Sequence, residues 1–82
     1  MNQIKLLFFA TIRERVGVKS LDLELPAEAT IGDLKVTLSG KYPNIKDSLK
    51  SVLVTINREY AFDEAVIPSG AEIGVFPPVS GG

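Results

Sequence analysis

The sequence predicts an α+β fold in which one main helix and one short helix accompany a mixed sheet of about five strands. Segment 20–26, SLDLELP, alternates leucines with acidic residues, which is typical of a strand with one buried face. Segments 4–10 and 51–57 are rich in residues that favour strands. Segment 30–43 has apolar residues at helical spacing after a threonine that can cap a helix. Strands and one long helix in a chain of 82 residues indicate a single small domain.

The first element, IKLLFFA at 4–10, is expected to be an interior strand. Side chains alternate along a strand, so one face carries Ile4, Leu6 and Phe8, and the other carries Lys5, Leu7 and Phe9. Both faces are largely apolar, which predicts a strand covered on two sides. The TIRE segment at 11–14 has the Thr-x-x-Glu form of a capping box and predicts a short helix that ends at Gly17.

The middle of the chain predicts a half-buried strand followed by the main helix. In 20–26 the leucines point inward, Asp22 and Glu24 point to solvent, and a proline ends the strand. In 30–43, Thr30 can cap the helix with Asp33 in its first turn, and Pro43 prevents the helix from continuing.

The rest of the chain predicts three more strands. They are expected at 51–57, at 58–62 as a short strand, and at 71–76, with a turn at 67–70 before the last. A hairpin, a helix that crosses it and a returning final strand describe the β-grasp arrangement seen in ubiquitin. This arrangement is one of several α+β topologies that the pattern allows.

Composition excludes several classes of function. The chain has no cysteine and no histidine, so it lacks a thiolate, the commonest general base and the commonest metal ligands, and no metal site is expected. Net charge is −1 and the nine basic residues form no dense run, which does not favour nucleic-acid binding. The apolar run at 6–10 is too short for a signal peptide or a membrane span, so we expect a cytoplasmic protein. Asp63 and Glu64 are interpreted as solvated turn residues, and no independent active site is expected.

The second apolar face of the first strand has two interpretations. One helix covers only one face of a small sheet, yet Leu7 and Phe9 point away from Leu6 and Phe8. Either a loop folds over them, or they belong to an open surface for a partner, where aromatic residues are enriched.

The C-terminal segment FPPVSGG divides the chain into a domain at 1–76 and an extended, flexible tail at 77–82. Six residues after Phe76 reach roughly 20 Å when fully extended. Pro77 and Pro78 lack amide protons and favour an extended path. Gly81 and Gly82 have no side chains and can enter a narrow channel, where the tail would deliver its own carboxylate. The alternative is a floppy end without function.

Three segments, KLLFFATIRERVG (5–17), INREY (56–60) and FPPVSGG (76–82), together resemble the small subunit of molybdopterin synthase, a ubiquitin-like sulfur carrier. The resemblance implies that a separate activating enzyme uses ATP to adenylate Gly82, which then becomes a thiocarboxylate. It also implies that the tail enters the large subunit of a heterotetramer, where the sulfur converts cyclic pyranopterin monophosphate to molybdopterin. The chain would then act only as the sulfur-donating subunit of a sulfurtransferase.

The resemblance also implies particular residues and partners. The contacts with the large subunit or the activating enzyme would come from Phe9, Arg13, Tyr60 and Phe76. The inserted tail would comprise Pro77, Pro78, Val79, Ser80, Gly81 and Gly82. A sulfur donor protein is a further implied partner, and the chain itself would bind no cofactor. Three alternatives remain: a carrier for thiamine thiazole synthesis, a protein modifier joined to lysines through Gly82, and an interaction module with an inert tail.

Overall fold

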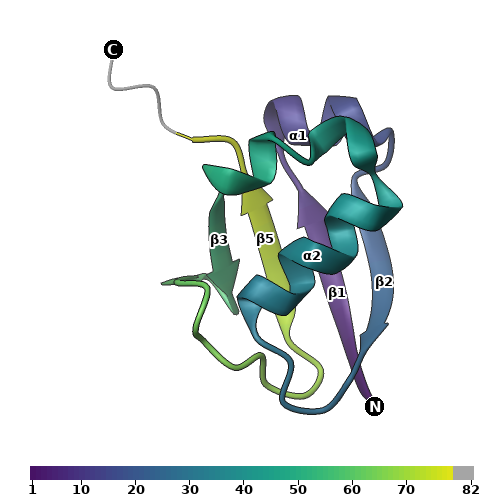
Figure 1. Ribbon diagram of the computed structural model, residues 1–82. Coiled ribbons are helices and arrows are strands. Elements are labelled where there is room, and N and C mark those ends of the chain that lie inside the picture. The colour runs from purple at the N-terminus through teal and green to yellow at the C-terminus, as the bar shows by residue number, and fades with distance from the viewer. Residues whose placement is uncertain (79–82) are drawn as a thin grey trace.

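The computed structural model describes residues 1–78 and shows a five-stranded sheet with helix α2 lying across one face (Figure 1). The elements in chain order are β1 (Asn2–Phe8), α1 (Ala10–Val16), β2 (Ser20–Leu25), α2 (Ile31–Lys41), the short 3-10 helices η1 (Pro43–Ile45) and η2 (Ser48–Lys50), β3 (Leu53–Ile56), β4 (Glu59–Ala61) and β5 (Glu72–Phe76). The strand order is β2-β1-β5-β3-β4. Strands β1 and β5 are parallel and the other neighbours are antiparallel, so the predicted mixed sheet is confirmed.

The first and last strands lie side by side in the middle of the sheet (Figure 1). In their register Leu7 lies opposite Gly74, and on the other side of β5 Leu53 lies opposite Phe76. Because β5 is flanked by β1 and β3, the chain leaves the sheet from its centre, next to the end of β1. This position determines which side chains surround the start of the tail.

Helix α2 begins with the predicted cap. The Thr30 Oγ1 accepts a hydrogen bond from the Asp33 N–H at 3.1 Å, and the Thr30 N–H donates to Asp33 Oδ2 at 3.0 Å. This reciprocal pair satisfies two amide donors that the first turn leaves without helical partners. The helix ends at Lys41, directly before Tyr42 and Pro43, as the proline predicts.

The core lies between α2 and one face of the sheet. On this face β1 contributes Ile4, Leu6 and Phe8, each at most 3% exposed. Residues of α2 at helical spacing, Ile31, Leu34 and Leu38, pack into the same cluster.

A buried asparagine connects the two ends of the fold. The Asn2 Nδ2 donates to the carbonyl oxygens of Ile67 and Pro68 at 3.0 and 3.1 Å, and Asn2 Oδ1 accepts from the Gly70 N–H at 3.1 Å. These bonds satisfy backbone groups of the turn that leads into β5.

Some predicted details are wrong. Strand β1 is covered on one side only, and it ends at Phe8 because the chain turns into α1 at Ala10. The predicted capping box at Thr11 does not form: Phe9 occupies the N-cap position, and no side chain caps the helix. The Phe9 N–H still donates to the Val75 carbonyl, so the sheet holds the residue that starts the helix. The predicted end at Gly17 is confirmed, with φ of +86° and an N–H that donates to Arg13.

The two 3-10 helices between α2 and β3 were not predicted. They bury Ile45 and Leu49 against the core.

Candidate partner interface

The sheet face opposite α2 has an apolar half and a polar half. The register places Leu7, Gly74 and Thr55 in one row across β1, β5 and β3, and the same row continues to Tyr60 on β4. Around this row is a cleft of about 250 Å³. It is lined by Leu7, Phe9, Thr55, Arg58, Tyr60, Gly74 and Phe76. We call this the aromatic cleft.

Two phenylalanines far apart in the sequence form one wall of the aromatic cleft. The Phe9 and Phe76 rings stack with centroids 4.3 Å apart and planes 2° from parallel. The hydrogen bond from the Phe9 N–H to the Val75 carbonyl at 3.1 Å holds the two backbones together. Phe9 remains 37% exposed, although burying such a ring would stabilise the protein. A stacked, partly exposed aromatic pair is the kind of surface that anchors a protein partner.

Gly74 forms the floor beneath this wall. A Cβ at this position would lie 2.6 Å from Thr55 Oγ1 and 2.8 Å from Phe76 Cε1. Because Gly74 has no side chain, the Phe76 ring can lie directly over the backbone at this position. Glycine normally weakens the middle of a strand, and here the close approach of a ring explains its presence.

The structure brings together three of the four predicted partner residues. Phe9, Tyr60 and Phe76 line the aromatic cleft, and Tyr60 is 74% exposed. Arg13 is also exposed, but it lies on α1 outside the lining, where its N–H donates to the Phe9 carbonyl at 3.3 Å. Because Phe9 and Tyr60 are exposed, the interpretation in which a loop covers this face is wrong for the described part of the chain.

Sequence reasoning missed three lining residues: Thr55, Arg58 and Gly74. The glycine was the one detectable signal, since it interrupts an otherwise apolar strand in AEIGVF. Arg58 lies in the turn between two strands, and nothing in its neighbours indicates which way the turn presents it.

The tail begins at the edge of the aromatic cleft. Pro77 and Pro78 follow Phe76 directly; Pro77 is half-buried and Pro78 is exposed. The other predicted tail residues, Val79, Ser80, Gly81 and Gly82, lie outside the described residues.

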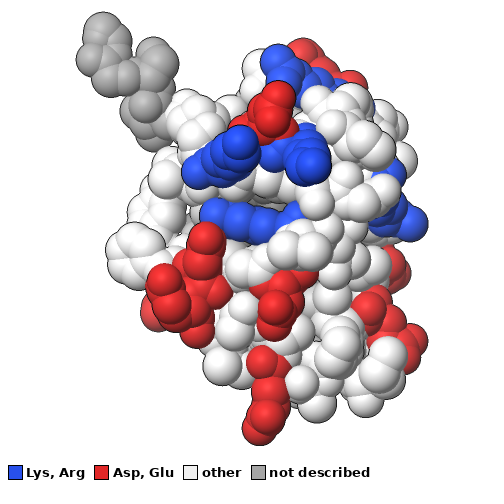
Figure 2. Space-filling view, in the orientation of Figure 1, with Lys and Arg blue, Asp and Glu red and all other residues white. Residues whose placement is uncertain are grey.

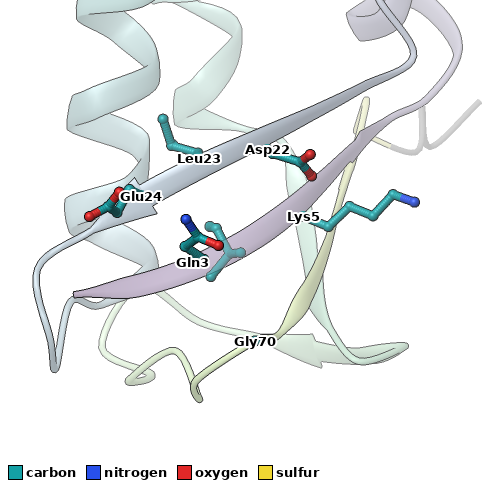
Figure 3. A pocket seen from close by; sticks show the side chains of 7 residues that line it. Gln3, Lys5, Asp22, Leu23, Glu24 and Gly70 are labelled. Atoms are coloured by element: carbon teal, nitrogen blue, oxygen red, sulfur yellow. The ribbon is translucent and has the colours of Figure 1, made fainter.

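The polar half of the same face has a hollow between β1 and β2, of about 470 Å³ (Figure 3). Gln3 and Lys5 project from β1, and Asp22 and Glu24 project from β2. All four side chains are exposed, as the strand alternation predicts for Asp22 and Glu24. This half is a solvated surface, so the apolar cleft is the stronger candidate for a partner.

On the opposite side, over α2, lysines and arginines gather mainly in the upper part of the view and acidic residues mainly below them (Figure 2). One ion pair bridges helix and loop, with Lys35 Nζ 2.7 Å from Asp63 Oδ1. None of the helices in residues 1–78 is long and apolar enough to cross a membrane.

The fold and the site define a ubiquitin-like β-grasp protein that exposes an aromatic cleft beside its C-terminal strand. The chain belongs to the ThiS family, whose model matches residues 6–82. The molybdopterin synthase sulfur carrier subunit of Dictyostelium discoideum is 40% identical over 84 aligned positions, which cover 99% of this chain and 98% of that protein. The subunit of the same name from Arabidopsis thaliana is 35% identical over 98% of this chain and 83% of that protein. The resemblance seen in the sequence is confirmed.

Solved structures agree on the fold. A Pyrococcus furiosus protein described as a candidate subunit 1 of molybdopterin converting factor has a TM-score of 0.88 at 26% identity, over 96% of this chain and all of that chain. SAMP1 from Haloferax volcanii has a TM-score of 0.86 at 27% identity, over 99% of this chain and all of that chain. A Helicobacter pylori complex of subunits 1 and 2 of molybdopterin-converting factor has a TM-score of 0.69 at 20% identity, over 98% and 99% of the two chains, and shows the fold alone.

Proposed function

We propose that this chain is the sulfur carrier subunit of a molybdopterin synthase and that Gly82 carries the sulfur as a thiocarboxylate. The observation that carries the proposal is the aromatic cleft at the start of the tail, in a chain whose family match extends through residue 82. Such a cleft holds the body of the carrier on a partner, so that the residues after Phe76 extend into the partner's active site. The names of the relatives support the same role.

The chemistry proposed for Gly82 needs no side chain of this protein. An activating enzyme would join the Gly82 carboxylate to the α-phosphate of ATP, with release of pyrophosphate. Sulfide-level sulfur from a donor protein would then attack the acyl carbon, the C–O bond to AMP would break, and the thiocarboxylate would remain. This route suits a chain without cysteine, because the sulfur is attached to the main chain.

The acceptor side of the reaction would belong to the large synthase subunit. Its active site would bind cyclic pyranopterin monophosphate and supply the acid–base groups, since this chain has no histidine. Phe9, Tyr60 and Phe76 would contact the large subunit or the activating enzyme through the aromatic cleft, and Arg13 would contact one of them from α1. The relatives named as the sulfur carrier subunit of molybdopterin synthase support such an assembly. We propose a cytoplasmic heterotetramer.

Mass spectrometry of the loaded protein tests the proposal. Incubation with activating enzyme, ATP and a sulfur donor is expected to replace one oxygen of the C-terminal peptide with sulfur. Deleting Gly82, or adding a residue after it, should abolish loading without loss of fold, because the buried core is built from residues between Ile4 and Val75. Gly40→Ala is the matched control, since nothing lies within 4 Å of a Cβ built at this position. The loaded carrier with a large subunit should then convert cyclic pyranopterin monophosphate to molybdopterin.

A protein modifier is the second candidate, because a neighbour of 27% identity is SAMP1, and the related structures name it small archaeal modifier protein 1. In that case Gly82 would be found in amide linkage to lysines of other proteins. Loading without conversion of the pterin would instead favour the thiazole pathway. Failure of loading with every activating enzyme would favour the inert-tail module.

A further inference from the structure

The turn between β3 and β4 has an unusual backbone. Its two central residues, Asn57 and Arg58, have φ of +49° and +74°. Positive φ at both central residues is the pattern of a type I′ turn, in which Asn followed by Gly is the preferred pair. Asn57 suits its position, but arginine at the second position has a conformation that is unfavourable for a residue with a Cβ.

The turn is held in this conformation by β5. The Asn57 N–H donates to the Glu72 carbonyl at 2.8 Å, and the Asn57 Oδ1 accepts from the Glu72 N–H at 2.9 Å. Two hydrogen bonds to one residue fix the turn relative to the sheet. The Cα–Cβ bond of Arg58 therefore leaves the turn in a fixed direction.

That direction is the aromatic cleft, which Arg58 lines together with Phe9, Tyr60 and Phe76. Arg58 is the one charged residue of the lining, and no carboxylate accompanies it. Within residues 1–78 the ion pair that forms joins Lys35 to Asp63, so Arg58 has no acidic partner there. A guanidinium presents five donors in a planar fork that matches a carboxylate.

We propose that Arg58 determines specificity in the aromatic cleft by binding a carboxylate of the large synthase subunit. The occupant would be a segment that places an apolar side chain against Phe9 and Phe76, and an aspartate or glutamate beside it against Arg58. Charge complementarity supports this occupant, because the single charge in a mostly apolar lining is positive. The strained backbone supports it as well, since glycine would relax the turn but would remove the side chain. The proposal rests on the proposed function.

The test compares Arg58→Gly and Arg58→Gln with Lys41→Gln. All three variants lose one positive charge, and Lys41 lies at the end of α2, on the other side of the sheet. Binding of the unmodified carrier to the large subunit is measured by calorimetry at about 0.05 M and about 1 M salt, where the screening length falls from more than 10 Å to roughly 3 Å. Folding is followed by thermal unfolding.

We expect Arg58→Gly to unfold at the same or a higher temperature than the wild type, yet to bind about 10-fold more weakly at low salt. Arg58→Gln should show a similar loss of affinity. For both variants the loss should shrink to about two-fold at high salt because the charges are screened, and Lys41→Gln should remain within about two-fold throughout.

Three outcomes would overturn the assignment. The first is binding by both Arg58 variants that equals that of Lys41→Gln. The second is a loss of affinity that is independent of salt. The third is a wild-type dimer in sedimentation that becomes monomeric in Arg58→Gly, which would make a second copy of this chain the occupant. If the wild type itself does not bind a large subunit, the proposed function fails as well.

Discussion

Phe8 and Phe9 are neighbours in the sequence, and truncating each of them should separate folding from partner binding. Phe8 is 2% exposed, with its ring 6.1 Å from that of Tyr42 in an edge-on arrangement. Phe9 is 37% exposed and stacks on Phe76. We expect Phe9→Ala to weaken binding to the large subunit strongly, and Phe8→Leu to affect only folding.

The cost to folding is calculated from the surroundings of each ring. For Phe9→Ala, loss of the stack costs about 0.5–1.5 kcal/mol, and loss of the apolar surface that is shielded in this partly buried residue costs about 1–2 kcal/mol. Relaxation at an open site reduces the sum, so about 2 kcal/mol is expected. Phe8→Leu keeps an apolar side chain in the core and should cost about 1–2 kcal/mol. Phe8→Ala would cost about 3–5 kcal/mol. That is a large part of the total free energy of unfolding, which is roughly 4–12 kcal/mol for a chain of this length.

The cost to binding should differ much more. Truncation of an anchoring aromatic residue typically costs about 2 kcal/mol or more of binding free energy, which corresponds to a Kd about 30-fold higher. Phe76→Ala removes the other half of the stack and should show a comparable loss. Phe8→Leu should bind within about two-fold of the wild type, because its side chain faces the core.

Urea unfolding followed by circular dichroism measures stability, and calorimetry with the large subunit measures affinity. If Phe9→Ala binds as tightly as Phe8→Leu, the aromatic cleft is not the partner surface. If Phe9→Ala loses as much stability as Phe8→Ala, Phe9 is a core residue and its exposure has no functional meaning.

Three further predictions concern the fold that presents the cleft. Gly17→Ala should lower the free energy of unfolding by about 1 kcal/mol, because Gly17 has a φ of +86°. Gly40→Ala in α2 should raise it by about 0.5–1 kcal/mol, and equal effects of the two variants in urea unfolding would contradict the left-handed cap. Thr30→Ala should cost about 1 kcal/mol by removing the capping box, and Thr30→Ser should restore most of it; an unchanged unfolding midpoint in Thr30→Ala would count against the cap. Asn2→Ala leaves two carbonyls and one amide of the 67–70 turn without their partner and should cost about 2–3 kcal/mol; hydrogen exchange at Gly70 no faster than in the wild type would refute this role.

The sequence by itself determined most of the secondary structure and the class of protein. Alternation in SLDLELP, the Thr30 cap and Pro43 are local signals, because side-chain direction, capping and proline geometry depend on residues close in the chain. The resemblance of FPPVSGG to the sulfur carriers is also a local signal, because the residues that carry it are consecutive in the chain. The predicted start of α1 was wrong because the Phe9 N–H remains hydrogen-bonded to the Val75 carbonyl. This contact across the sheet outweighs the capping potential of Thr11.

Only the tertiary structure decided how the site is assembled. Strand alternation placed Phe9 on the open face, but its stacking on Phe76 depends on the parallel pairing of the first and last strands. Strand alternation places Phe76 on the same face as Gly74, but only the pairing of β3 with β5 brings Thr55 beside that glycine. Arg58 reaches the cleft because two hydrogen bonds between Asn57 and Glu72 of β5 hold an unfavourable turn. Contacts between residues distant in the chain arise from the packing of the whole sheet, so a sequence read segment by segment does not contain them.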